Sequence, residues 1–122
     1  MPPSKKILVI DDEPDILRLM IELLEAAGYE CFQAIEPVDG LKKALEHRPD
    51  LIVLDLMLQK MSGFGFLRLI RINPIIGHIP VLVLSGLYDK DVVNEALDLG
   101  AKAYLTKGCE PEELIATIRD YA

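Results

Sequence analysis

The sequence predicts an α/β protein, in which a doubly wound, five-stranded parallel sheet is packed between five helices. Two observations predict this class. Strand-length apolar runs alternate along the chain with stretches of helical spacing, which is typical of parallel sheets joined by crossover helices. Three of the runs, LVI, LIVL and VLVL, are continuously apolar, as expected for strands that are buried on both faces.

The apolar runs are short enough to be strands, and most contain β-branched or aromatic side chains. We expect strands at 6–10, 29–35, 51–56, 80–85 and 101–106. The second run, YECFQAI, mixes polar with apolar residues, so we place it at an edge of the sheet.

Apolar residues between the strands recur at intervals of three and four, which is the spacing of one helix face. The stretches with this spacing are 16–27, 38–45, 66–70, 92–99 and 111–118. Gly28 and Gly100 follow the first and fourth stretches, where glycine commonly ends a helix, and Pro111 suits the first position of the last. The spacing places Leu19 and Val38 on the buried faces of their helices.

Composition restricts the class of function. The chain has 122 residues, of which 51% are hydrophobic, so it is long enough for one domain with a real core. A net charge of −7 argues against direct binding of nucleic acid. No apolar run approaches the roughly 18–20 residues of a membrane span. Cys31 and Cys109 have neither disulfide-framework nor zinc-site spacing, so we expect a reduced, cytoplasmic setting.

Acidic residues follow two of the predicted strands. Asp11 and Asp12 come directly after the first strand, and Asp55 lies at the end of the third. Sites in open parallel sheets form at the carboxyl ends of the strands, so these carboxylates are expected at one edge. At about 4 Å and an effective dielectric constant of about 20, two such charges repel by roughly 4 kcal/mol, which favours a bound cation. Oxygen ligands at a solvent-facing edge suit Mg²⁺, although Asp11 and Asp12 alone are equally well explained as a helix cap.

Two more strands end in groups that suit a phosphoryl group. Ser85 ends the fourth strand and is followed by Gly86, and Lys107 ends the fifth. A hydroxyl, an ammonium and an accessible backbone N–H are the donors that phosphoryl oxygens require. Singly, Ser85–Gly86 is typical of an ordinary turn and Lys107 of a solvated strand end. Together with the three acids, they predict a site for metal and phosphate.

The chain resembles the receiver domain of two-component response regulators. The matching segments are VIDDEP, IVLDLML, MSG at 61–63, VLVLSG and GAKAYLTKG at 100–108, and the likeness extends over essentially the whole chain. It implies a flavodoxin-like sheet with strand order 2-1-3-4-5. It also implies a single receiver domain over residues 1–122, with no effector domain among them.

The resemblance implies a role for each acid. Asp55 corresponds to the phosphoacceptor, a carboxylate nucleophile that becomes an acyl phosphate. Asp12 would ligate Mg²⁺ directly and Asp11 largely through water, with Asp55 and the backbone carbonyl of Met57 as further ligands. Mn²⁺ is the alternative ion.

The resemblance also implies roles for the donors. Lys107 would pair with one phosphoryl oxygen and Ser85 would hydrogen-bond another, with the backbone of Met57 and Gly86 nearby. Tyr104 occupies the aromatic position whose rotamer is coupled to the Ser85 hydroxyl in the family. A half-buried tyrosine on an outer strand is also common packing, so residue type alone does not establish this switch role.

Three residues depart from the family's pattern. Gly108 stands where the family usually has a proline, often after a cis bond. Cys109 stands where an aromatic residue is common, and Gln59 where a proline is frequent. These changes concern loop geometry and activation, and leave the phosphoacceptor in place.

Met57 and Leu87 lie two residues after Asp55 and Ser85, at positions that in this family influence how fast water attacks the acyl phosphate. Both side chains are apolar and offer no hydrogen bond to that water. We therefore expect a comparatively long-lived phosphoryl group.

The resulting hypothesis is a phosphorylatable switch and not an enzyme with a separate substrate. It would receive its phosphoryl group from a histidine kinase or a histidine phosphotransfer protein. The fourth helix, fifth strand and fifth helix would present the altered surface, and the same surface is where two copies would pair.

The sequence leaves two alternative functions. A receiver-like binding module that does not use phosphate gains slight support from Gly108. An aspartate-based phosphohydrolase is disfavoured, because its general acid/base would stand where this chain has Met57.

Overall fold

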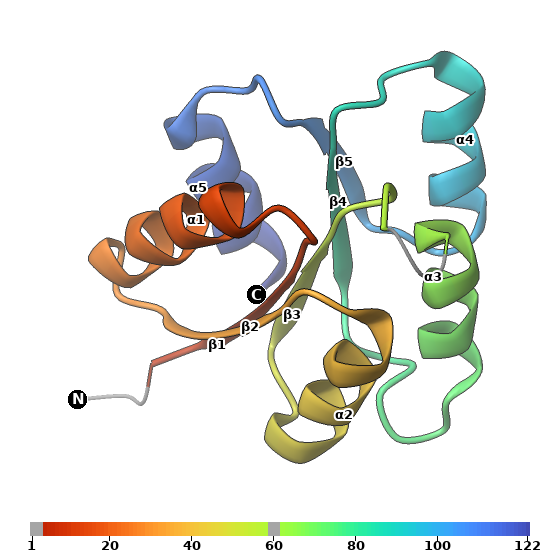
Figure 1. Ribbon diagram of the computed structural model, residues 1–122, viewed down its shortest axis with the longest axis horizontal. Coiled ribbons are helices and arrows are strands. Elements are labelled where there is room, and N and C mark those ends of the chain that lie inside the picture. Colours follow the sequence, from red (N-terminus) through yellow and green to blue (C-terminus); the bar gives the residue numbers. More distant parts are fainter. Residues whose placement is uncertain (1–3, 59–61) are drawn as a thin grey trace.

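The computed structural model describes residues 4–58 and 62–122, and it confirms the predicted α/β class (Figure 1). Strands and helices alternate from one end of the described chain to the other. The elements are β1 (Lys6–Ile10), α1 (Pro14–Ala26), β2 (Glu30–Ala34), α2 (Pro37–His47), β3 (Leu51–Leu54), α3 (Gly63–Ile72), β4 (Val81–Ser85), α4 (Lys90–Asp98), β5 (Ala103–Thr106) and α5 (Pro111–Tyr121).

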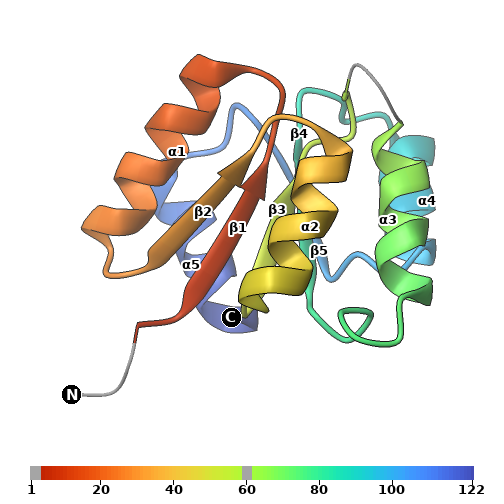
Figure 2. The same cartoon turned by 60° about the horizontal axis from the view of Figure 1, so that its bottom comes forward.

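The strands form one five-stranded parallel sheet in the order β2-β1-β3-β4-β5, as the resemblance implied. Figure 2 shows β2 on the outside of β1, so the expected edge position of this mixed strand is confirmed. β1, β3 and β4 occupy the centre, and their residues are buried almost without exception. Because all strands are parallel, their carboxyl ends meet at the same edge.

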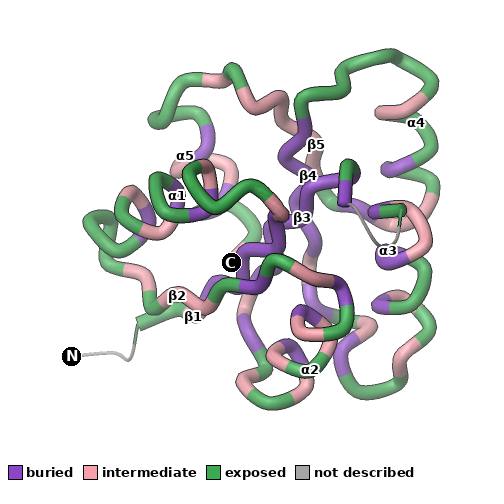
Figure 3. The backbone as a smooth tube through the Cα atoms, in the orientation of Figure 1, coloured by how far each residue is buried: buried purple, intermediate pink, exposed green. Residues whose placement is uncertain are grey.

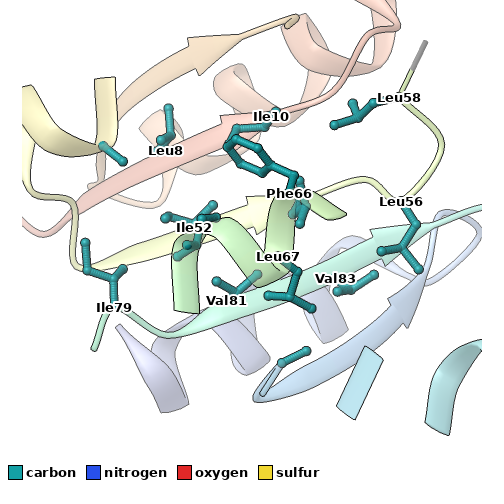
Figure 4. Packing of buried hydrophobic residues seen from close by; sticks show 14 of the residues in the cluster. Leu8, Ile10, Ile52, Leu56, Leu58, Phe66, Leu67, Ile79, Val81 and Val83 are labelled. Carbon is teal, nitrogen blue, oxygen red and sulfur yellow. The ribbon is translucent and has the colours of Figure 1, made fainter. Parts of the chain in front are cut away.

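The helices cover both faces of the sheet. α1 and α5 lie on one face and α2, α3 and α4 on the other (Figure 1). Successive strand residues point to opposite faces, so Ile7 and Val9 pack towards α1 and α5, whereas Leu8 and Ile10 pack towards α2 and α3. Figure 4 shows Phe66 of α3 lying beside Ile10 in this second cluster. The sheet is therefore enclosed on both faces (Figure 3).

The helix ends agree with the expected signals. Gly28 and Gly100 adopt φ values of 97° and 102° just beyond α1 and α4, a left-handed conformation that favours glycine. Pro111 occupies the first turn of α5, as expected. No helix in the described part of the chain has the length and apolar character needed to cross a membrane.

Some of the positions predicted on buried helix faces are exposed, and Leu19 and Val38 are the clearest cases. Leu19 is 62% exposed and Val38 is 76% exposed, whereas the sequence placed both on buried faces. Leu17, Met20 and Leu24 form the buried face of α1. Both exposed residues lie at the margin of an apolar stripe, where a small rotation of the helix decides which side chain reaches the sheet.

Two isoleucines of α3 offer a matched test of this core. Ile70 is fully buried and Ile72, two residues later, is 77% exposed. We expect Ile70→Ala to lower the free energy of unfolding by about 2–5 kcal/mol, because it removes buried methylenes and leaves a cavity. Ile72→Ala should stay within about 0.5 kcal/mol. Urea denaturation of both variants measures the difference, and equal effects would contradict the packing described here.

Candidate functional site

The carboxyl edge of the sheet brings the predicted acids together. The Asp11 N–H donates to the carbonyl of Ala34 at 3.1 Å, which fixes the residue after β1 against the end of β2. The Asp55 N–H donates to the carbonyl of Ile10 at 3.0 Å, which fixes the residue after β3 against the end of β1. Both aspartates are therefore the first residues beyond neighbouring buried strands; for Asp11 this was predicted, whereas β3 ends one residue before Asp55 and was predicted to include it.

Asp11, Asp55 and Ser85 are buried polar residues, and each accepts a hydrogen bond from the backbone two residues later. Asp11 Oδ1 accepts from the Glu13 N–H at 2.9 Å, and Asp55 Oδ1 accepts from the Met57 N–H at 3.1 Å. Ser85 Oγ accepts from the Leu87 N–H at 3.2 Å. These local turns orient the side chains of three adjacent strands, which satisfies part of their hydrogen-bonding capacity.

Lys107 joins the acids into one network. Its Nζ lies 3.0 Å from Oδ2 of both Asp11 and Asp55. The same Nζ contacts Oε1 of Glu13 at 3.1 Å. The backbone places the lysine here, because the Lys107 N–H donates to the carbonyl of Ser85 at 2.9 Å and extends the pairing of β4 and β5 by one residue.

Charge and burial act against each other at this network. Burial lowers the pKa of Lys107, but hydrogen bonds to Asp55, Asp11 and Glu13 outweigh it and leave the pKa raised. Burial raises the pKa of Asp11; the hydrogen bonds from Glu13 and Lys107 oppose this, and the Asp55 charge adds to it. Lys107 is thus held firmly as an ammonium, whereas Asp11 bears its negative charge at a cost.

The acids fit a divalent cation by the chemistry of their donors. Asp11, Asp12, Glu13 and Asp55 each offer a carboxylate oxygen, and these four atoms lie within 4.8 Å of one another. The donors are hard oxygens at a partly open edge, the setting that Mg²⁺ or Mn²⁺ prefers. The cluster contains four carboxylates, and Lys107 contacts three of them, so an excess of negative charge remains for a cation to offset.

Ser85 and Tyr104 lie on neighbouring strands beside this network. The Tyr104 hydroxyl donates a hydrogen bond to the carbonyl of Leu87, in the loop between β4 and α4. Burial raises the pKa of Tyr104, an effect that hydrogen bonding to Ser85 opposes and the Asp55 charge reinforces. Tyr104 therefore links β5 to the loop that begins at Ser85.

Gly63 explains how α3 approaches Asp55. A Cβ at this glycine would lie 2.4 Å from the Cα of Leu56 and 2.8 Å from the carbonyl oxygen of Asp55. Only a residue without a side chain allows this approach. Gly86 differs, because a Cβ there would meet no atom within 4 Å. It is exposed after Ser85, which leaves its backbone accessible, as the prediction requires.

The loops that depart from the family's pattern are only partly described. No peptide bond of the described residues is cis, so the Lys107–Gly108 bond is trans. Cys109 is half-buried, and its N–H donates to the carbonyl of Thr106 at 3.0 Å. Gln59, and Met61 of the MSG segment, lie outside the described residues.

One member of the network was missed by the sequence analysis. The sequence analysis gave Glu13 no role, whereas the structure pairs it with Lys107. The available signal was that Glu13 is the third acid in a row. The roles expected for Asp11 and Asp12, as a helix cap or as metal ligands, left this third acid unexplained. Its partner could not be read from spacing, because the two residues are 94 positions apart.

The fold and this edge define a class: a doubly wound domain with clustered acids, a hydroxyl and a lysine at the carboxyl ends of its strands. Residues 7–119 match the family described as the response regulator receiver domain. The chain belongs to that family.

Curated relatives agree with this assignment. The DNA-binding dual master transcriptional regulator RpaA of Synechocystis is 41% identical over 93% of this chain and 47% of its own length. The phosphate regulon transcriptional regulatory protein PhoB of Pseudomonas aeruginosa is 35% identical, over 95% of this chain and 51% of its own length. The chain thus spans about half the length of these regulators. The polar-differentiation response regulator DivK of Brucella anthropi is 30% identical, over 96% of this chain and 95% of its own length.

Solved structures have the same fold. The chemotaxis protein CheY4 of Vibrio cholerae superposes with a TM-score of 0.91 at 29% identity, covering 98% of this chain and 99% of that one. A response regulator receiver domain protein of Clostridium thermocellum gives 0.87 at 35% identity, covering 96% and 93%.

Excess negative charge at the edge leads to a prediction for stability. We expect Asp12→Asn to raise the free energy of unfolding of the metal-free protein by about 1 kcal/mol, because it removes repulsion between carboxylates. The same change should reduce the stabilisation that added Mg²⁺ produces, since a ligand that binds only the folded state stabilises it. Thermal unfolding with EDTA and with Mg²⁺ measures both effects.

Asp15→Asn is the matched control for this measurement. Asp15 lies in the first turn of α1, three residues after Asp12, and its side chain is 92% exposed and pairs with Arg18 at 3.3 Å. It should alter stability by no more than about 0.5 kcal/mol and leave the Mg²⁺ response intact. A destabilised Asp12→Asn variant with an undiminished Mg²⁺ response would contradict the proposed role of Asp12.

Proposed function

We propose that this receiver domain accepts a phosphoryl group on Asp55, in a Mg²⁺-dependent reaction, and changes its surface in response. The observation that carries the proposal is the contact of the Lys107 ammonium with both Asp11 and Asp55 at 3.0 Å. This contact unites the ends of three strands at one point. It leaves a buried carboxylate next to the ammonium that would pair with a phosphoryl oxygen.

The transfer step follows from the chemistry of these groups. A carboxylate oxygen of Asp55 attacks the phosphorus of a phosphohistidine in line with the leaving imidazole. A P–O bond forms as the P–N bond breaks, and the imidazole leaves with the electron pair and takes up a proton. Lys107 offsets charge on one phosphoryl oxygen, and the Ser85 hydroxyl hydrogen-bonds another. The chain catalyses only its own phosphorylation and dephosphorylation in this proposal, so it is not an enzyme with a separate substrate.

Asp11, Asp12 and Asp55 are the residues that would hold Mg²⁺, together with the backbone carbonyl of Met57. The ion supplies charge neutralisation for the phosphoryl oxygens. Without such neutralisation, an anionic donor would approach an edge that already carries several carboxylates. Asp11 and Asp55 are kept in place by the Glu13 and Met57 amides, so the acids are oriented before any ligand arrives.

The conformational change would be transmitted from the site to the surface through β4, β5 and α4. Ser85 contacts the Leu87 amide, and Tyr104 contacts the Leu87 carbonyl, so both proposed switch residues act on the loop before α4. Only Ala96 of α4 is fully buried, which makes this helix one of the less firmly packed elements of the sheet's cover. A phosphoryl group that attracts the Ser85 hydroxyl would alter this loop, and α4, β5 and α5 would present the changed surface.

The partners follow from the same proposal. A histidine kinase or a histidine phosphotransfer protein is the donor, and a downstream protein or effector domain is the recipient. Two relatives are named as transcriptional regulators, and this chain covers about half of each. We assign no direct contact with DNA to the acidic edge. Pairing of two copies through α4, β5 and α5 is an additional expectation of the proposal.

Intact mass spectrometry tests the phosphoacceptor. Incubation with Mg²⁺ and a small acyl-phosphate donor should add one phosphoryl group to the protein. The adduct should be lost in Asp55→Asn and in the presence of EDTA. If the wild-type chain gains no adduct while a known receiver is labelled in parallel, the proposal fails, and a phosphate-independent binding module becomes the better explanation.

A second test concerns the lifetime of the phosphoryl group. Met57 is exposed beside Asp55, and Leu87 lies partly exposed after Ser85, so apolar groups surround the approach to the site. Neither side chain can hold an attacking water by a hydrogen bond, and we expect the adduct to outlast seconds at neutral pH. Met57→Asn should shorten its lifetime, because an amide can orient that water. Decay of the wild-type adduct within seconds, measured by mass after donor removal, would contradict this expectation.

A further inference from the structure

The ammonium of Lys107 is surrounded by carboxylates in this structure. A lysine ammonium has three N–H donors, and three carboxylates lie within 3.1 Å of the Lys107 Nζ. Two of them, Asp11 and Asp55, already have roles in the proposed function. The third, Glu13, has none.

The three contacts differ in what it takes to break them. The side chains of Asp11 and Asp55 are 3% and 1% exposed, whereas that of Glu13 is 59% exposed. A buried carboxylate that loses its cation is left without compensation, which is strongly unfavourable. An exposed carboxylate is hydrated when it loses its cation, so an exposed ion pair contributes little stability. Glu13 is therefore the partner that Lys107 releases most easily.

Accepting a phosphoryl group requires such a release. The proposed function needs a Lys107 N–H to donate to a phosphoryl oxygen, and in this structure three carboxylates already contact the ammonium. Glu13 Oε1 makes the most solvent-accessible of the three contacts.

We propose that Glu13 is the exchangeable counter-ion of Lys107: it holds the ammonium in the resting domain and competes with the phosphoryl group for it. This inference rests on the proposed function. When the phosphoryl group arrives, one N–H of Lys107 turns from Glu13 Oε1 to a phosphoryl oxygen, and Glu13 is hydrated. Glu13 thus acts as a positioning residue that restrains phosphorylation.

The test compares Glu13→Gln with Asp15→Asn. Each change removes one negative charge near the start of α1, but only Glu13 contacts Lys107; Asp15 pairs with Arg18. The rate of adduct formation is measured by intact mass with a small acyl phosphate at saturating Mg²⁺, so that altered metal affinity does not enter. We expect Glu13→Gln to react about two- to fivefold faster than the wild type, the range that an exposed ion pair allows. Asp15→Asn should react at the wild-type rate.

A second readout needs neither donor nor metal. In protein labelled with ¹⁵N on the lysine side chains, exchange of the Lys107 ammonium protons with water reports on its contacts. Glu13→Gln should speed this exchange, and Asp15→Asn should not. Unchanged exchange in Glu13→Gln would refute the resting contact, whatever the kinetics show.

The kinetic outcomes separate this inference from the proposed function. If the wild-type chain forms no adduct, the proposed function is overturned, and the competition with it. If the wild-type chain is labelled but both variants accelerate equally, a general charge effect is responsible and the counter-ion role is wrong. A slower Glu13→Gln variant would also overturn the proposal, because Glu13 would then assist the reaction.

Discussion

The ion pairs of Lys107 with Asp11 and Asp55 are the interaction on which the rest of the site depends. Asp55 is 52 positions away from Lys107 along the chain, so this contact exists only when the sheet is complete. Two buried carboxylates without a cation would be strongly unfavourable, as would a largely buried ammonium without carboxylates. The network therefore requires β1, β3 and β5 to end at the same level. It also makes the site sensitive to any ligand that competes for these groups.

The fold was predictable because its strongest signals are local. Continuous apolar runs can be satisfied only by strands enclosed on both faces, and alternation with helices leaves a parallel sheet as the solution. That solution places Asp11, Asp55, Ser85 and Lys107 at one edge, so their proximity followed from the class of fold. The position of Tyr104 on an outer strand followed in the same way, but its contact with Leu87 depends on side-chain geometry.

The errors come from features that spacing does not determine. Leu19 and Val38 belong to apolar stripes that are wider than the surface available to bury them. In α1, Leu17 is buried against the sheet and Leu19 is exposed. Glu13 was missed for a different reason. Glu13 directly precedes α1 in the sequence, whereas its partner, Lys107, directly follows β5. A pairing between two loops is visible only once the order of the strands and the reach of the side chains are both known.

The same edge shows why a domain of this kind need not be optimised for stability. Burial raises the pKa of Asp11, and the acids that surround Lys107 outnumber it, so the resting site retains unfavourable charge. Removing that charge by mutation would stabilise the fold but would also remove the attraction for a cation.

Lys107 and Tyr104 lie three residues apart around the end of β5, one at the charged network and the other at the loop before α4. The backbone N–H of Lys107 binds the carbonyl of Ser85, while the Tyr104 hydroxyl binds the carbonyl of Leu87. A change in what the ammonium binds therefore acts on a strand end that is already attached to the β4–α4 loop at two points. This attachment is a short physical route by which charge at the site could bias the position of α4.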